Sequence, residues 1–148
     1  MVLINSQRKG ASAEREVASL IFQNTGVRLK RNLEQSRFGG HDLVPDGEGQ
    51  NWPIALEIKN YAEARPANIT SWWKQTITQA EIAKQIPCLW YKDRRRWRVV
   101  VPGNVIMPEI PWGQMEAYTV TVSPEMFYSI YREFLLEGHL LVADTEKI

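Results

Sequence analysis

The sequence predicts an α/β fold, in which a helix and three strands are followed by a second helix and two further strands. Apolar residues recur at helical spacing over residues 13–24 and again over residues 69–80, and apolar and polar residues alternate over residues 54–59. The chain has 148 residues, of which 44% are apolar and 24% charged, as in an average globular protein. We therefore expect one domain, residues 1–148, with one continuous core.

In the first half of the chain, Ser12 is a candidate N-cap for a helix over residues 13–24. The apolar stripe of this helix consists of Ala13, Val17, Ala18, Leu20 and Ile21. Alternation predicts a strand over residues 27–33, and a short strand over 41–44 precedes a turn at 45–47. The clearest strand is 54–59, in which Ile54, Leu56 and Ile58 point to one side and Ala55, Glu57 and Lys59 to the other.

In the second half, a helix begins at Asn68 or Thr70, reaches about Gln85 and is ended by Pro87. Its expected buried stripe contains Ile69, Trp73, Ile77 and Ala80. Two strands, 88–92 and 97–101, are joined by the basic turn 93–96. We expect Trp97 to pack inward and Cys88 to be a small buried apolar residue.

Residues 118–122 predict one more strand, and Ser123 with Pro124 predicts the start of a helix that runs to residue 137 and ends at Gly138. The apolar side chains of this helix form a wide face: Met126, Phe127, Ile130, Tyr131, Phe134 and Leu135. This face covers either the sheet of its own subunit or a second copy of the chain.

The composition excludes several classes of protein. No apolar stretch approaches the ~20 residues needed to cross a bilayer, and no signal peptide is readable at the N-terminus. A single cysteine excludes an internal disulfide framework, and with His41 and His139 as the only histidines a zinc site is unlikely to form. We expect a soluble intracellular protein, cytoplasmic in a bacterial, archaeal or phage-infected cell, with neither a membrane partner nor an organic cofactor.

Charge is distributed unevenly along the chain. The formal net charge is 18 − 17 = +1, but residues 1–38 carry a net +4, residues 39–91 a net −2, residues 92–98 a net +4 and residues 99–148 a net −5. Basic segments on either side of an acidic centre suit a polyanion bound with a metal ion. The alternative is that folding disperses these charges over a mixed surface.

Three acidic residues occupy positions that are unfavourable for a charge. Glu14 borders the apolar stripe of the first helix, Asp42 begins a short strand, and Glu57 lies inside the strongest strand on the same face as Lys59. An E-x-K pair alone is usually a solvated ion pair on a sheet. Together these residues supply the carboxylates that Mg²⁺ prefers and an ammonium that can stabilise negative charge, provided that the two strands are neighbours.

With this order and spacing, Asp42, Glu57, Ile58 and Lys59 resemble the D-(x)n-E-x-K signature of the PD-(D/E)xK nuclease superfamily. Residues 9–15 resemble the first-helix motif of archaeal-type Holliday junction resolvases and their phage-borne relatives. The resemblance covers residues 7–101 and implies a restriction-endonuclease-like core of order αβββαβ, a central mixed sheet flanked by helices, with residues 102–148 as a C-terminal strand-helix appendage. His41 stands where the family usually has proline.

The resemblance implies a role for each matching residue. Asp42 and Glu57, with the Ile58 carbonyl, would bind Mg²⁺, for which Mn²⁺ would substitute, and Glu14 would approach the metal directly or through water. Lys59 would act on the attacking water. Gln79 would support the site from the second helix, and Gln75 ranks below it because it lies further from the buried stripe.

The basic residues near this set are candidate DNA contacts. They are Arg8 and Lys9 at the first helix, Ser36 and Arg37 in the loop before Asp42, and Arg94, Arg95 and Arg96 in the second turn. Junction-resolving relatives act as symmetric homodimers, so we expect this chain to self-associate.

We therefore predict a metal-dependent DNA endonuclease that acts in recombination or repair, with a resolvase-like preference for Holliday junctions. Another enzyme reading is a repair, restriction or genome-processing nuclease of the same superfamily. A hypothesis from a different class is a DNA-binding module without activity. Cleavage that requires a metal ion and Asp42 would distinguish the enzymes from the module.

Overall fold

The computed structural model describes residues 2–33 and 42–135, with side chains from residue 10 onward. Its centre is a mixed sheet of six strands in the order β1-β2-β3-β4-β5-β6. Neighbouring strands are antiparallel except β3 and β4, which are parallel. The strands are β1 (Leu29–Arg31), β2 (Leu43–Pro45), β3 (Ile54–Lys59), β4 (Ile86–Asp93), β5 (Arg96–Pro102) and β6 (Thr119–Val122). The helices are α1 (Val2–Thr25), α3 (Pro66–Ala83) and α4 (Pro124–Ile130), which continues into a π-helical turn, Tyr131–Leu135.

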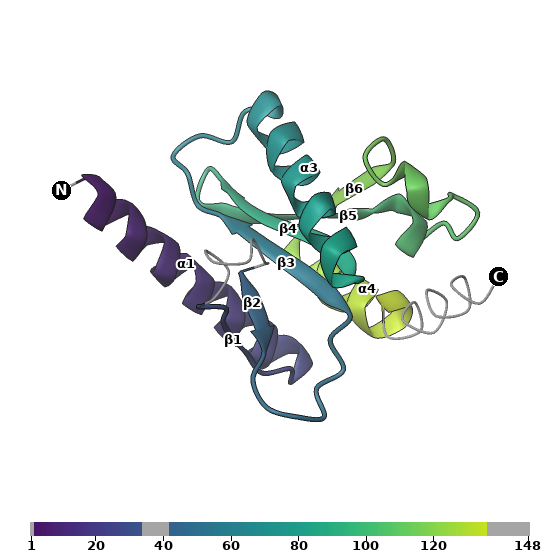
Figure 1. Cartoon of the computed structure of the whole chain (residues 1–148), viewed down its shortest axis with the longest axis horizontal. Helices are drawn as coiled ribbons and strands as arrows, with labels where there is room; N and C mark the ends of the chain where they lie inside the picture. The colour runs from purple at the N-terminus through teal and green to yellow at the C-terminus, as the bar shows by residue number, and fades with distance from the viewer. Residues whose placement is uncertain (1, 34–41, 136–148) are drawn as a thin grey trace.

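Helices cover both faces of the sheet, and α3 connects the parallel strands β3 and β4 (Figure 1). The main core lies between the sheet and helices α1 and α4, and includes Val17, Ile21, Leu56, Trp90 and Phe127. A smaller core lies under α3, where Trp73 packs with Leu89, Tyr91 and Val100. The α/β fold and the αβββαβ order are thus confirmed.

Strand β3 matches the prediction residue for residue, and its alternate residues Ile54, Leu56 and Ile58 belong to the main core. Leu56 and Ile58 belong to the core under α1 and α4, so Glu57 and Lys59 point toward the side of α3. The strand predicted over 27–33 is shorter, as β1, and the one predicted over 41–44 is shifted, as β2. Asp42 therefore precedes β2 and does not begin it, and Pro45 lies in the strand and not in the predicted turn over 45–47, because its backbone still pairs with Leu29.

Both long helices begin earlier than predicted. Helix α1 begins at Val2, so Ser12 lies inside the helix and is not its N-cap; the sequence before it contains no proline, and Gly10 is tolerated. Helix α3 begins at Pro66, where proline suits the first helical position. It ends at Ala83 because Lys84 adopts a left-handed conformation, φ 55°, and the expectation that Pro87 ends it is wrong, since that residue lies in β4.

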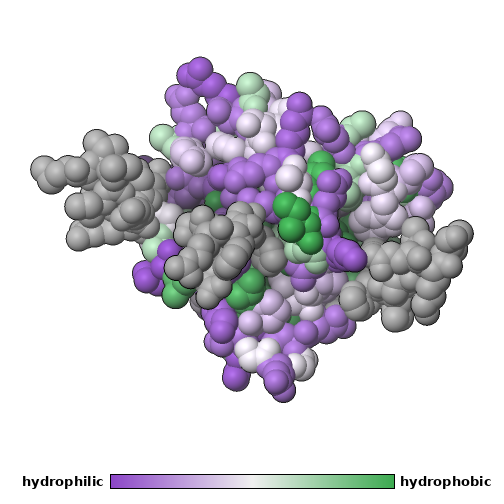
Figure 2. Space-filling view, in the orientation of Figure 1, coloured by the Kyte–Doolittle hydropathy of each residue, from purple (hydrophilic) through white to green (hydrophobic). Residues whose placement is uncertain are grey.

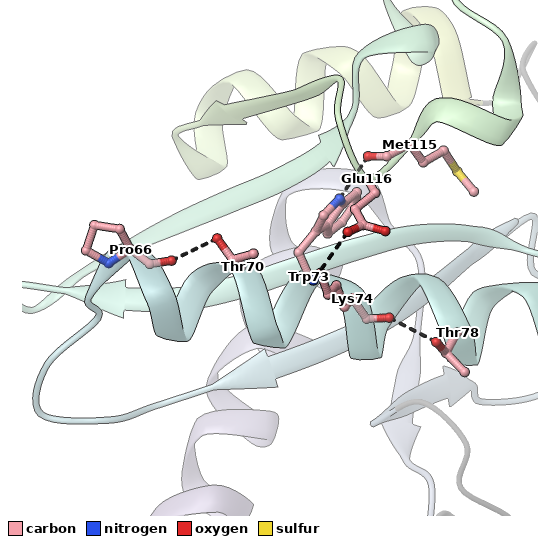
Figure 3. Close-up of polar contacts among 7 residues, drawn as sticks. All are labelled: Pro66, Thr70, Trp73, Lys74, Thr78, Met115 and Glu116. Carbon is pink, nitrogen blue, oxygen red and sulfur yellow. Dashed lines mark hydrogen bonds and ion pairs between the residues drawn. The ribbon is translucent and has the colours of Figure 1, made fainter.

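The buried stripe of α3 consists of Trp73, Thr76 and Ala80, while Ile69 and Ile77 are half-buried. Two contacts fix this helix to the segment before β6 (Figure 3). Trp73 Nε1 donates to the Met115 carbonyl at 2.9 Å, and Lys74 Nζ lies 3.4 Å from Glu116 Oε1. A buried indole and a surface ion pair therefore fix the orientation of α3 about its own axis.

The C-terminal part of the described chain completes the sheet and the core. Strand β6, predicted over 118–122, pairs with β5, and Ser123 caps α4 as predicted, its Oγ accepting from the Met126 N–H at 3.2 Å. Phe127 and Ile130 are buried in the main core, so this helix covers the sheet of its own subunit. Met126 and Phe134 stay exposed, and the predicted helix end at Gly138 lies outside the described residues.

In the part of the chain that the structure describes, no helix has the length and apolar character needed to cross a membrane. The face shown in Figure 2 is mainly hydrophilic, and its hydrophobic residues form small separate areas.

The β4–β5 hairpin is tighter than the predicted turn over 93–96. Asp93 and Arg96 pair in the strands, which leaves a two-residue turn of Arg94 and Arg95 with φ values of 51° and 67°. Positive φ at both positions is typical of a type I′ turn, for which Asn-Gly is the favoured sequence. Trp97 and Cys88 are buried, as predicted.

We predict that Arg95→Gly raises the free energy of unfolding by about 0.5–1 kcal/mol, because glycine adopts positive φ without steric cost. Urea denaturation followed by circular dichroism measures this change. Arg96→Gly is the matched control, since this exposed arginine lies in β5, where glycine lowers stability. Equal effects of the two substitutions would contradict the explanation.

Candidate active site

Asp42 lies where β2 separates from β3. The last ladder pair joins Leu43 to Leu56, and the Asp42 N–H donates to the Leu56 carbonyl at 2.8 Å. The Ile58 N–H then donates to Asp42 Oδ2 at 2.7 Å. Asp42 directly precedes β2, so its side-chain carboxylate accepts a hydrogen bond from β3 where the backbone pairing of the two strands has stopped. Asp42 is buried, with 3% of its surface exposed. The two strands are thus neighbours, as the predicted acidic set requires.

Glu57 and Lys59 form an ion pair on the side of the sheet that faces α3. Lys59 Nζ lies 3.2 Å from Glu57 Oε1, and the lysine side chain is only 16% exposed. Glu57 is 4% exposed, and its second oxygen, Oε2, is buried without a hydrogen-bond partner among the described residues. A buried carboxylate oxygen without a partner is unfavourable unless another group binds it.

The pKa of Glu57 rises from 4.5 to about 7, and the causes show which groups surround it. Burial is the largest cause, followed by the negative charge of Asp42, and Glu14 adds a smaller rise. Lys59 lowers the pKa by its charge and hydrogen bond but does not offset the other effects. Asp42 and Glu14, both far from Glu57 in sequence, therefore act electrostatically on its carboxylate.

Glu14 approaches this group from α1 and is held by an arginine that the sequence analysis did not select. Arg31 Nε lies 2.5 Å from Glu14 Oε2, and the glutamate side chain is 13% exposed. A signal for this pair was present in the sequence. Arg31 follows Val27 and Leu29 in the alternation, both buried, so it stands at an apolar position where a charged side chain requires a partner.

The two glutamines of α3 differ in their surroundings. Gln75 is exposed, whereas Gln79 is half-buried and its Oε1 has no hydrogen-bond partner within residues 10–33 and 42–135. Gln79 lies on the helix that packs on β3 and β4. Its role in supporting the site stays a prediction.

The donor set fits a hard divalent cation held by few protein ligands. Across the described ranges, no group of three or more His, Cys, Asp and Glu side chains could hold a metal ion. Asp42 and Glu57 nevertheless offer two adjacent carboxylates, and Mg²⁺ commonly uses one or two together with water and phosphate oxygens. The unpartnered Glu57 Oε2 is the observation that favours such a ligand.

The structure describes only some of the candidate DNA contacts. Ser36, Arg37 and His41 lie outside the described residues, and the backbone of Arg8 and Lys9 is helical but their side chains are not described. Arg94, Arg95 and Arg96 are exposed. Because β4 runs parallel to β3, the hairpin turn lies at the same edge of the sheet as Lys59.

We predict that Glu57→Gln stabilises the metal-free protein at pH 8. The folded-state pKa of Glu57 is raised, so the folded protein retains a proton that the unfolded chain releases between pH 4.5 and about 7, and stability falls as pH rises through this range. The glutamine should raise the free energy of unfolding by on the order of 2–3 kcal/mol at pH 8, with the difference vanishing near pH 4.

Urea denaturation in EDTA at the two pH values measures this effect. Glu48→Gln is the control, because that glutamate is exposed in the segment before β3 and its substitution should change little at either pH. A Glu57→Gln difference that is independent of pH would refute the assigned origin of the raised pKa.

Comparisons with known proteins were made against families, curated sequences and solved structures. No curated protein sequence matches the chain. Among solved structures, Hjc, a Holliday junction resolvase from the archaeal hyperthermophile Archaeoglobus fulgidus, is similar with a TM-score of 0.43 and 18% sequence identity, over 85% of this chain and 96% of that chain.

The sequence matches a family model over residues 5–128, from α1 through β6 into α4. The matched region contains Glu14, Asp42, Glu57 and Lys59, and it extends beyond residue 101. The description of the family is "Phage putative PDDEXK endonuclease". The chain belongs to this family of phage PDDEXK endonucleases.

Proposed function

We propose that the chain is a metal-dependent DNA endonuclease that hydrolyses phosphodiester bonds. The observation that carries this proposal is the buried Glu57, paired with Lys59 and adjacent to Asp42, at the carboxyl end of β3. Membership in a nuclease family supports the reaction class. A module that only binds DNA has no use for acidic groups that repel a polyanion, two of which raise the pKa of the third, Glu57.

Asp42 and Glu57 would hold the cation, with the Ile58 carbonyl as a further oxygen ligand. We propose Mg²⁺, with Mn²⁺ as a substitute, because all three ligands are hard oxygen donors. When bound, such an ion neutralises phosphate charge and lowers the pKa of water. The Ile58 N–H holds the Asp42 carboxylate in place through a 2.7 Å hydrogen bond, so one ligand is oriented before any ion binds.

Lys59 would stabilise the negative charge that develops on the phosphate. Its Nζ is 3.2 Å from Glu57 Oε1 and mostly shielded from water, which strengthens its interaction with an anion. Glu14, restrained by Arg31, would act at the periphery of the site, and Gln79 would orient groups from α3. Arg94, Arg95 and Arg96 would contact the DNA backbone at the same edge of the sheet.

We further propose branched DNA as the preferred substrate and a symmetric homodimer as the active form. The first-helix motif at residues 9–15, with its resemblance to junction resolvases, supports the substrate. Two strands cut at related positions favour a two-fold arrangement of protomers. Met126 on α4 and Phe134 in the π-helical turn that follows it are exposed apolar residues available to such a contact.

We predict that the protein cleaves a labelled four-way junction with Mg²⁺ or Mn²⁺ and that EDTA abolishes cleavage. Asp42→Asn should lower the rate by at least about 100-fold while junction binding, measured by fluorescence anisotropy, is retained. Glu48→Gln serves as a control with unchanged rate. Binding without cleavage under every metal would instead identify a DNA-binding module, and equal cleavage of linear duplex would refute the preference for junctions.

We predict that isothermal titration calorimetry detects Mn²⁺ binding to the protein without DNA, weakened by about tenfold or more in Asp42→Asn and in Glu57→Gln. Binding should also weaken below pH 7, because Glu57 with a pKa of about 7 then competes for a proton. Glu48→Gln should bind Mn²⁺ like the unmodified protein. Unchanged affinity in both site variants would refute the proposed ligands.

A further inference from the structure

A row of three aromatic side chains lies beside Lys59. The ring of Trp72 stacks on Tyr61, with centroids 5.2 Å apart and planes inclined by 20°. Trp72 also meets Tyr91, with centroids 6.3 Å apart and planes inclined by 46°. Tyr61 follows the end of β3, Trp72 belongs to α3 and Tyr91 to β4, so three segments contribute one ring each.

The register of the sheet places this row next to the proposed active site. Lys59 pairs with Tyr91 across β3 and β4, and Tyr91 pairs with Arg98 across β4 and β5. Paired residues project from the same face of a sheet, so the ammonium, the phenol and the guanidinium lie side by side on the face toward α3. The pKa of Tyr91 is raised by burial and by the charge of Asp93, and the charge of Arg98 lowers it, which agrees with this placement.

Packing of α3 does not account for the outer end of the row. The adjacent Trp73 already anchors α3 to the segment before β6 (Figure 3). It is 4% exposed, and its indole N–H donates a hydrogen bond to the Met115 carbonyl. Trp72 is only half-buried, and Tyr61 is 55% exposed. An aromatic pair that remains this open at one end is available to stack with a further flat ring.

The surrounding charge favours a nucleic acid as the source of that ring. Lys59 and Arg98 flank Tyr91, and the exposed arginines of the hairpin turn lie at the same edge of the sheet. The nearby acids are Glu57, which pairs with Lys59 at 3.2 Å, Asp93, opposite Arg96 in the hairpin, and Glu63, which pairs with Arg65 at 2.9 Å. Flat rings beside cations are the features with which proteins bind unpaired nucleotides.

We infer that Tyr61 and Trp72 form a stacking platform for an unpaired nucleobase of the DNA substrate. This base would lie next to the phosphate whose negative charge Lys59 stabilises. This inference rests on the proposed function and narrows its substrate to DNA with an unpaired or unstacked base near the cleavage point. A base inside a continuous duplex has no exposed face to offer. The platform therefore gives a physical basis for preferring branched or bulged DNA over linear duplex.

The test uses the full chain in EDTA, so that it does not depend on cleavage. The probe is a duplex with one unpaired 2-aminopurine, whose fluorescence falls when it stacks. The native protein should quench the probe, and Tyr61→Ala should remove most quenching and weaken affinity, measured by anisotropy, by about tenfold. Tyr61→Phe should retain both, and Tyr118→Ala, which removes a tyrosine of similar exposure (49%) ahead of β6, should change neither.

Replacing the unpaired base by an abasic site, or removing the bulge, should abolish the difference between Tyr61→Ala and the native protein. Equal loss of affinity for bulged, abasic and fully paired DNA would overturn the platform, even if the protein cleaves junctions. Quenching that depends on Tyr61 in a protein that cleaves nothing would support the platform and overturn the proposed activity alone. A Tyr61→Ala variant whose only change is a lower oligomeric state in sedimentation analysis would assign the surface to a second copy of the chain and overturn the inference.

Discussion

The hydrogen bond from the Ile58 N–H to Asp42 Oδ2 determines the geometry of the site. It joins β2 to β3 at the point where their backbones separate, and it brings the Asp42 carboxylate close enough to raise the pKa of Glu57. Folding thus holds two acids together although their repulsion opposes it. Such an arrangement persists when the surrounding core is stable enough to impose it, and it is relieved when a cation binds.

The parallel pairing of β3 and β4 explains why so many functional candidates meet at one edge of the sheet. A parallel pair requires a crossover, here α3, so the chain leaves β3 at the edge where the β4–β5 turn also lies. The same edge therefore carries Lys59, the arginine turn and the aromatic row. These groups are neighbours in space although they are far apart in sequence: Arg98, which flanks Tyr91, follows Lys59 by 39 residues. In open α/β sheets this carboxyl edge is where ligands generally bind.

The sequence predicted those features that depend on local pattern. Strand β3 follows the alternating pattern because each of its faces packs against a different layer, and Ser123 with Pro124 specifies a helix start through a local cap, in which the Ser123 Oγ accepts from the Met126 N–H. It did not predict the start of α1 or the end of α3, since Gly10 lies inside a helix despite its low helix propensity and Lys84 adopts a left-handed conformation that lysine seldom takes. The partnership of Glu14 with Arg31 was also missed, because it joins a helix to a strand and appears in sequence only as a break in alternation.

The arginine turn shows how function and stability can oppose each other in the same residues. Arg94 and Arg95 occupy a conformation that glycine and asparagine adopt more readily, and within the described chain they form no ion pair that would offset the strain. Glu57 presents the same conflict inside the sheet, where burial and a neighbouring acid disfavour its charge. Both departures from the most stable choice lie at the carboxyl edge of β3 and β4. The proposed ligand would compensate both, since a phosphate backbone would attract the arginines and the cation bound with it would neutralise the acids. Terms that are unfavourable in the free protein would then become favourable in the proposed complex with metal and DNA.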